Sequence, residues 1–443
     1  MKQTILLTLL TISYSLSCAY TEDLDKMRDT IRYGTDSEIA ALLKTVKSSK
    51  ITELDDDLST LAIRSKNEMI VNALFSYFMD GEKKGLEDKA IGILENREEN
   101  EKTSVSAIEY LGAIKEKKAK DILKEIISKD ESPYINSAVK ALGKIAREMG
   151  SGVSNDTAEY LIAYYTDKSP KLDTCREIII ALGSTGSKES LDFLCKIIDD
   201  DDEESSYLKI ASLTALGEIK DQGTLETILK ATQSTDASVK SSAVAALGGF
   251  NDAKADEAII DAFRDSFFRT RLSAVKAAGE RKLSAAIPYL RYRAINDDAA
   301  SVREESVSVL GAMNKNEAGS VLLEILEDKK INDKIRISCA QALLKNEASQ
   351  YCERIIELAE DAKAKKYTML YSGLLKALST AKSAKLKDFA ARLFTSKDVT
   401  DNAIALDITA NNSFGNFKEE VQRISETKNS TLAAKALKIL SSL

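Results

Sequence analysis

The chain has 443 residues, of which 44% are hydrophobic and 30% are charged, and its formal net charge is −7. This acidic balance argues against a general nucleic-acid binder, because such proteins neutralise phosphates with an excess of lysine and arginine. The sequence contains no histidine, which excludes Ser-His-Asp and Cys-His catalysis and every histidine-ligated metal site.

Residues 1–19 have the order of a secretory signal peptide. One lysine precedes an apolar run over 5–12, and small residues then lead to Cys18. The run is shorter than the roughly 20 apolar residues that a spanning helix needs. Cleavage fits either before Cys18 or after Ala19. Residues 15–18, Ser-Leu-Ser-Cys, resemble the lipobox of bacterial lipoproteins, although serine stands where leucine is preferred. The sequence therefore predicts export to the bacterial periplasm or cell envelope, with lipid attachment at Cys18 if cleavage precedes it and loss of Cys18 if cleavage follows Ala19.

The chain after this segment repeats itself. Six segments end in the same glycine column, and the steps between successive endings from Gly183 onwards are 34, 31, 31, 32 and 33 residues. A fixed period of this length predicts stacked repeats rather than separate compact domains. The step of 40 residues from Gly143 to Gly183 predicts an insertion, in the form of a longer loop near REMGSGVSNDTA. The aligned segments are YINSAVKALG (134–143), TCREIIIALG (174–183), LKIASLTALG (208–217), VKSSAVAALG (239–248), TRLSAVKAAG (270–279), VREESVSVLG (302–311) and IRISCAQALL (335–344).

Each repeat predicts a hairpin of two helices. Apolar residues recur at helical spacing in the shared segment, as at Val239, Ala243 and Leu247. A polar turn and a second amphipathic stretch follow. A second column, of small residues five places before the glycine, predicts close contacts between helices. The glycine column itself either serves the same close contact or relaxes the last turn of the helix. That second column contains Ala138, Ser212, Ala243, Ala274, Ser306 and Cys339.

These segments resemble the short version of the HEAT repeat, first noted in phycobilisome lyases, with its V-R-x-x-A-x-x-A-L-G signature. The resemblance implies an all-α fold, an α-α superhelix or solenoid of the HEAT/armadillo-like kind with about a dozen helical hairpins. We expect four parts: the signal peptide (1–19), diverged N-terminal repeats (20–101), the repeat core (102–345), and diverged C-terminal repeats with a cap (346–443).

The second place of the motif is a basic column. Its members are Lys209, Lys240, Arg271, Arg303 and Arg336, and acidic residues stand just upstream at Asp236, Asp265, Asp298 and Asp333. The resemblance implies a structural ladder of ion pairs between consecutive repeats, in which the acids also cap helix N-termini. The functional alternative is a cationic strip for an acidic partner.

No cluster of residues indicates a catalytic, cofactor or metal site. Cys195 and Cys339 fall in apolar columns, whereas Cys175 stands where other repeats have Lys or Arg, so we expect it to be partly exposed. The acidic run over 199–204 lacks the glycine and the spaced ligands of an EF-hand loop. A locally basic surface is predicted from Lys363, Lys365, Lys366, Lys382, Lys385 and Lys387.

The resemblance implies a non-enzymatic scaffold that binds a protein or peptide on its curved surface. The lipobox-like residues before Cys18 add attachment to a membrane through lipid alone. In the family, helices with the V-R motif line the concave side. Candidate contacts are therefore their exposed positions: Lys140, Lys144, Thr214, Glu218, Lys276, Glu280, Glu305 and Gln341.

Two other functions stay open. One is a carboxylate-dependent envelope enzyme or enzyme subunit, and the other is an intracellular adaptor with an uncleaved N-terminus. The family's di-iron deoxyhypusine hydroxylase activity is not expected, because it needs histidine ligands. Neither a cofactor nor a nucleic-acid partner is expected.

Overall fold

The computed structural model describes residues 23–96, 100–130, 133–200, 206–313 and 316–441. These residues form 25 α-helices and no strand, so the predicted all-α class is confirmed. No helix among them is long and apolar enough to cross a membrane. The predicted signal peptide (1–19) and Cys18 lie outside the described residues.

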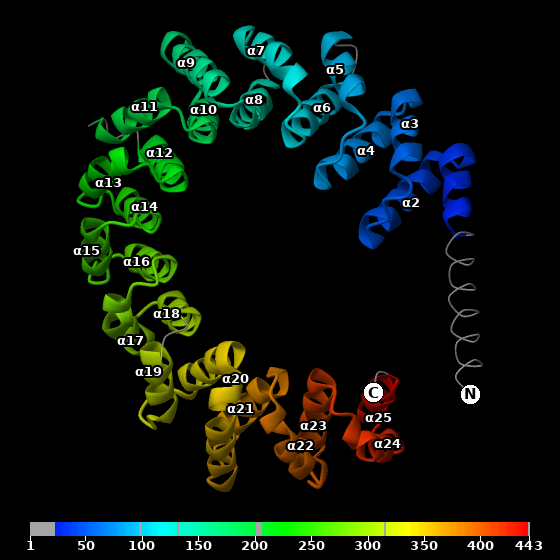
Figure 1. Cartoon of the computed structure of the whole chain (residues 1–443), viewed down its shortest axis with the longest axis vertical. Helices are drawn as coiled ribbons and strands as arrows, with labels where there is room; N and C mark the ends of the chain where they lie inside the picture. Colours follow the sequence, from blue (N-terminus) through cyan, green and yellow to red (C-terminus); the bar gives the residue numbers. More distant parts are fainter. Residues whose placement is uncertain (1–22, 97–99, 131–132, 201–205, 314–315, 442–443) are drawn as a thin grey trace. The chain divides into compact units, whose positions relative to one another are not determined.

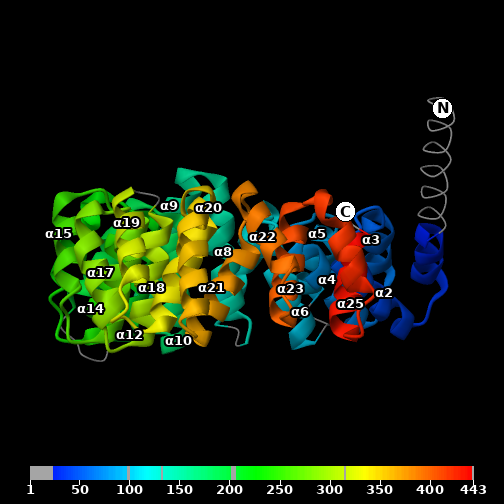
Figure 2. The same ribbon diagram turned by 90° about the horizontal axis from the view of Figure 1, so that it is seen from below.

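The chain divides into two compact units, Met1–Ile219 and Lys220–Leu443. Each unit is a stack of helical hairpins in chain order. We call the first helix of a hairpin, which carries the repeat motif where it is present, the A helix, and the second the B helix. Within each unit the A helices pack on one another in one layer, and the B helices form a second layer (Figure 1). The helices of a unit run between two edges, where the connections lie (Figure 2).

The first unit begins with a helix over 23–33. Its A helices are α2 (Asp36–Ser49), α4 (Glu68–Asp80), α6 (Glu101–Ala113), α8 (Ile135–Met149), α10 (Leu172–Thr185) and α12 (Ser206–Ile219). Its B helices are α3 (Asp55–Arg64), α5 (Glu87–Asn96), α7 (Lys120–Ser128), α9 (Ser151–Lys168) and α11 (Lys188–Asp199).

The second unit continues the same alternation. Its A helices include α14 (Ala237–Leu247), α16 (Phe268–Glu280), α18 (Ala300–Ala312), α21 (Thr368–Thr380), α23 (Val399–Asn412) and α25 (Ser430–Leu440). Its B helices include α13 (Leu225–Ala231), α15 (Ala253–Ala262), α17 (Ile287–Asn296), α19 (Asn316–Glu327), α22 (Lys387–Phe394) and α24 (Lys418–Ser425). The long α20 (Asp333–Ala364) is an A helix and a B helix joined at a kink, where Glu347 has φ −138° and ψ 50°.

The glycine column sets how closely successive A helices approach. A Cβ on Gly143 in α8 would lie 2.8 Å from both the Cα and the Cβ of Ala181 in α10. In the second unit, a Cβ on Gly311 would lie 2.9 Å from the Cβ of Ala342. Real Cβ atoms are hardly ever so close, so only glycine permits this packing. The predicted close contact between helices is therefore present. The same relation joins Gly112 to Ala141 and Gly183 to Ala215.

The predicted loop near 147–158 is wrong. Helix α8 extends to Met149, Gly150 alone reverses the chain with φ 90°, and α9 begins at Ser151. The Ser154 hydroxyl donates a hydrogen bond of 3.0 Å to the carbonyl oxygen of Ala146, which ties the two helices together. The extra residues therefore lengthen the helices of this hairpin, because one glycine with positive φ is enough to make the turn.

Candidate functional site

The exposed face of the A layer is where the predicted partner contacts lie. Their helices are α8, α12, α16, α18 and α20. Glu305 is half-buried, and the other seven are exposed: Lys140, Lys144, Thr214, Glu218, Lys276, Glu280 and Gln341. Most occupy the seventh and eleventh places of the motif, one helical turn apart, so they form a stripe along each A helix.

One groove on this face contains a predicted residue. It lies between the two halves of α20 and α21, has a volume of about 930 Å³, and includes Gln341. Its apolar lining comes from Leu344, Ala348, Ala377 and Ala381. Its charged lining consists of Lys345, Lys376 and Lys382 against Glu347, a formal excess of two positive charges. The three lysines are exposed, and the groove therefore presents a cationic surface beside an apolar strip.

Sequence analysis missed two of these lysines, although a signal was present. Lys345 occupies the eleventh place, like Lys144 and Glu218. Lys376 occupies the seventh place of a diverged repeat, because KALS at 376–379 aligns with KALG of the regular repeats. Extending the two columns past residue 344 would have found both.

The predicted basic surface is divided by α21. Lys363, Lys365 and Lys366 precede this helix, whereas Lys382, Lys385 and Lys387 follow it. The helix has 13 residues, so about 20 Å of helix separates the two groups. Only the second group reaches the α20–α21 groove, through Lys382.

Lys363 has a structural role in this region. Its Nζ lies 2.6 Å from Oδ2 of Asp401, whose carboxylate also accepts hydrogen bonds of 2.7 Å from the hydroxyls of Tyr371 and Ser396. Burial by itself would raise the pKa of the Asp401 carboxyl, but these hydrogen bonds outweigh it and leave that pKa below its ordinary value. Lys363 therefore holds a buried carboxylate in place.

The basic column of the motif makes contacts between repeats at two places in the second unit. Lys240 in α14 lies 3.1 Å from Asp265, which precedes α16. Arg271 in α16 donates from Nε and Nη2 to the carboxylate of Asp297, which precedes α18, at 2.7 and 2.8 Å. Asp298 also contacts Arg271. Both side chains of the Arg271–Asp297 pair are buried.

The other basic residues differ from the predicted ladder. Arg303 donates to the carbonyl oxygens of Asp297 and Asp298 in the loop before its own helix. Arg336 donates to the carbonyl oxygen of Leu326 at 2.8 Å and to Asp333 on its own helix at 3.0 Å. Lys209 donates to the carbonyl oxygen of Asp200. These side chains tie helix starts to the preceding loop or to the end of the preceding helix rather than forming a continuous row of ion pairs.

The acidic residues upstream of the motif differ in role. Asp236 is the N-cap of α14 and accepts from the backbone N–H groups of Ser238 and Val239. At α20 the N-cap is Asn332, not Asp333 as predicted. Asp333 lies one residue further along, inside the first turn, where its carboxylate reaches Arg336 instead.

The expected partial exposure of Cys175 is wrong. Its side chain is buried, with 8% of the residue exposed, because the second place of the motif points inward, as it does for Arg271 and Arg336. Burial raises the pKa of its thiol. Cys339 and Cys352 are also buried. No group of three or more Cys, Asp or Glu side chains in the described ranges could hold a metal ion, and part of the acidic run 199–204 lies outside them.

The stacked helical hairpins define the class of protein, which is an α-solenoid built from repeats. Within that class, the family model described as "Spirochaete HEAT repeat protein" matches residues 31–439, and the chain belongs to this family. The HEAT resemblance of the sequence motif is thereby confirmed. None of the curated proteins compared with the chain matches it.

Similar solved structures include importin beta and human deoxyhypusine hydroxylase. Importin beta in a polyethylene glycol condition is 12% identical with a TM-score of 0.40, and 96% of this chain covers 70% of that chain. Importin beta in an ammonium sulfate condition is 10% identical with a TM-score of 0.43, and the match covers 95% of this chain and 72% of that chain. The hydroxylase in complex with glycerol is 15% identical with a TM-score of 0.29, and the match covers 67% of this chain and 100% of that chain.

Proposed function

We propose that this HEAT-repeat protein is an exported, membrane-anchored scaffold that binds an acidic segment of a protein or peptide partner through its A layer. The observation that carries this proposal is the α20–α21 groove, where Lys345, Lys376 and Lys382 surround an apolar strip on the exposed helix face. Such a surface favours a segment with glutamate or aspartate residues between small apolar ones. Opposite charges steer association and select the partner.

The ionisation of the acidic side chains favours a binding role over carboxylate-dependent catalysis. A general acid needs a carboxyl group whose pKa is raised. Where the pKa of a described carboxyl group clearly departs from its ordinary value, it is lowered. Partly exposed groups such as Glu148 and Asp156 have it lowered by hydrogen bonds from lysines, and the buried Asp401 has it lowered as described above. These carboxylates are held ionised, as is typical of structural ion pairs.

The proposed groove predicts charge-dependent peptide binding. The probe is a fluorescent 12-residue peptide of alternating glutamate and alanine, with the lysine–alanine peptide as the comparison, measured by fluorescence polarisation on the full chain. We expect the glutamate peptide alone to bind. Reversing three charges in K345E/K376E/K382E should weaken its binding by about tenfold or more at low salt, and the effect should shrink as salt is added.

A matched control reverses three exposed lysines elsewhere in the second unit, in K387E/K418E/K428E. Its affinity should stay within about twofold of the unmodified chain, because only long-range charge is altered. Equal losses in both triple variants, or equal binding of the two peptides, would show that the groove does not select the peptide.

Export and anchoring are tested on the native N-terminus. Mass spectrometry of the protein purified from its own cells should find a diacylglyceryl group on Cys18 and no preceding residue. An intact Met1 would reject export and favour the intracellular adaptor. A chain that begins at Tyr20 would keep export but remove the lipid anchor.

A further inference from the structure

The A helices of the second unit begin at the same edge of its two layers, because each follows a B helix that runs in the opposite direction (Figure 2). We define the A-start edge as the loops before α16, α18, α20, α21 and α23 together with the first residues of these helices. It comprises residues 263–269, 297–301, 328–334, 365–369 and 395–400. None of these residues lines the α20–α21 groove, so the edge is a separate surface.

Exposed apolar side chains gather at the A-start edge. The described part of the second unit has six large apolar side chains that are well exposed, and four of them lie at this edge: Phe268, Tyr367, Met369 and Val399. Between 38% and 58% of each of these residues is exposed, so packing in the core does not account for them. Their position at one edge indicates a surface that another molecule covers.

Two aromatic residues stand where a helix cap is expected. Phe267 and Tyr367 are the N-cap residues of α16 and α21, and neither side chain accepts a hydrogen bond from the first turn. A polar N-cap contributes about 1 kcal/mol to a helix, and Asp236 caps α14 in this way. Helix stability therefore does not account for an aromatic residue at either place.

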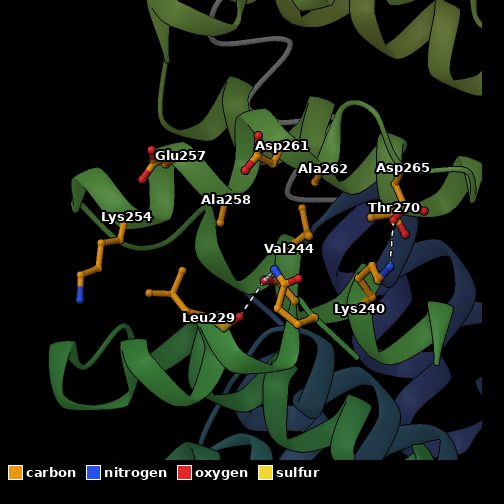
Figure 3. Close-up of a pocket in the computed structure, with 12 residues that line it drawn as sticks. Leu229, Lys240, Val244, Lys254, Glu257, Ala258, Asp261, Ala262, Asp265 and Thr270 are labelled. Atoms are coloured by element: carbon orange, nitrogen blue, oxygen red, sulfur yellow. Dashed lines mark hydrogen bonds and ion pairs between the residues drawn. The ribbon is translucent and has the colours of Figure 1, made fainter. Parts of the chain in front are cut away.

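The A-start edge has an excess of positive charge, although the chain as a whole is acidic. Six of its charged residues form ion pairs and are left out of the balance: Arg264, Asp265, Asp297, Asp298, Asp333 and Lys365. Figure 3 shows one of these pairs, Asp265 with Lys240. The exposed residues of the edge that form no ion pair with the described part of the chain are Arg269, Lys329, Lys330, Lys334, Lys366, Lys397, Asp328 and Asp398. They leave a formal excess of four positive charges.

The arrangement of these side chains favours a lipid surface over a protein partner. From α16 to α23 the edge spans four steps between neighbouring A helices, roughly 30–40 Å at the usual packing distance. The apolar side chains are spread over this length instead of forming the one contiguous core of a protein interface. A fluid lipid surface receives separated side chains without complementary sockets. Aromatic rings lie at the level of its headgroups, and lysine and arginine reach its phosphates.

We propose that the A-start edge of the second unit lies on the surface of a membrane that contains anionic phospholipids. Phe268, Tyr367 and Val399 enter the headgroup region, and the unpaired lysines and Arg269 meet the phosphates. The Arg269 guanidinium is suited to this position, since it lies 5.9 Å from the ring centroid of Phe268. The inference goes beyond the proposed function, because it assigns the edge that meets lipid and needs neither an acyl group on Cys18 nor the α20–α21 groove.

The experiment is vesicle sedimentation with the mature chain that begins at Tyr20. This chain keeps every described residue and lacks both Cys18 and the apolar run over 5–12, which would bind lipid by itself. Phosphatidylcholine vesicles with about 30% phosphatidylglycerol are compared with pure phosphatidylcholine vesicles. We expect binding to the anionic vesicles to be about tenfold stronger or more and to weaken as salt is added. F268S/Y367S/V399S and R269Q/K366Q/K397Q should each weaken it about fivefold or more.

The matched control is Y292S/L437S, which alters the two exposed apolar side chains of the unit that lie away from the edge. Its vesicle binding should stay within about twofold of the unmodified chain. Unchanged binding in either edge variant, an equal loss in the control, or equal binding to the two kinds of vesicle would overturn the assignment. F268S/Y367S/V399S should still bind the glutamate–alanine peptide, so failure of the two proposals can be told apart. If that variant lost the peptide and kept the vesicles, the edge would be a protein-binding surface and the assignment to lipid would be wrong.

Discussion

Arg271 and Asp297 form an ion pair that water hardly reaches. Their side chains are 6% and 0% exposed. Burial by itself would raise the pKa of the Asp297 carboxyl, but hydrogen bonds from Arg271 and from the backbone N–H of Ala299 outweigh it and leave that pKa below its ordinary value. A pair in this environment is not strongly stabilising in itself, but the removal of one partner leaves the other charge buried without compensation.

Asp297→Asn should therefore destabilise the protein by about 3 kcal/mol, because it removes the buried counter-charge of Arg271 and leaves only the exposed carboxylate of Asp298 beside it. The measurement is a urea titration followed by circular dichroism at 222 nm. Asp298→Asn is the control, since Asp298 is 85% exposed and its contact contributes about 0–1 kcal/mol. Equal shifts of the unfolding midpoint in the two variants would contradict the assignment of Asp297 as the main partner.

The sequence could predict Arg271 as part of an ion pair but not which aspartate it would meet. Asp297 and Asp298 are adjacent, and both lie upstream of the next motif. Which of them points inward depends on the path of the loop before α18, and no pattern in the sequence determines that path. The burial of Cys175 was missed for a related reason: charged residues in its column suggested exposure, but two of them, Arg271 and Arg336, are themselves buried.

The glycine column determines how closely successive A helices pack against each other. Gly143→Ala should destabilise the first unit by about 1–3 kcal/mol, because its Cβ would overlap the backbone of α10 at Ala181 and force the two repeats apart. Thermal unfolding by circular dichroism measures the effect.

Gly92→Ala is the matched control. Gly92 lies inside α5, and no atom of the kind that a new Cβ would meet is within 4 Å. Alanine should stabilise there by about 0.5–1 kcal/mol, because it restricts the unfolded chain and favours the helix. Stabilisation at both positions would show that the glycine column is not needed for close packing.

At the scale of elements, the period of 31–34 residues and the apolar stripe were enough to predict the hairpins and their register, since both follow from local spacing. The insertion after α8 was assigned wrongly, because glycine and serine are typical of loops and also of a tight turn followed by a helix start. The kink of α20 at Glu347 gave no sequence signal that we can name.

The whole molecule has no histidine, so no side chain has its ordinary pKa between pH 5.5 and 7.5. Asp297 and Asp401 have folded pKa values below the unfolded value of about 3.9. A lowered folded pKa stabilises the native state above pH 3.9, and this contribution is lost as the pH falls through the folded pKa. Lys363 and Tyr110 have raised folded pKa values, and their contributions are lost only above about pH 10.

The melting temperature should therefore vary by no more than about 2 °C between pH 5.5 and 8.5 and fall steeply below about pH 4. Thermal melts in buffers of constant ionic strength test this profile, and Asp297→Asn should reduce the acid-side fall. A step near pH 6.5 would contradict it, because no described group accounts for such a step.

The sequence predicted which layer of helices contains the candidate site, but nothing finer. The motif columns correctly placed exposed residues on A helices, since position along a helix determines which face a side chain occupies. The α20–α21 groove was not predictable as a groove, because its shape depends on the kink at Glu347.

The contact between a glycine and a small residue of the next repeat gives every regular hairpin the same pair of joining faces. A genetic duplication of one period would create a hairpin whose two ends already fit its new neighbours, so each unit can grow or shrink by whole repeats without compensating changes. Val309 stands where the other regular repeats have alanine, and its two methyl carbons lie 3.0 and 3.1 Å from the place of a Cβ on Gly279. The joining face therefore also admits a larger side chain, provided that the preceding repeat ends in glycine.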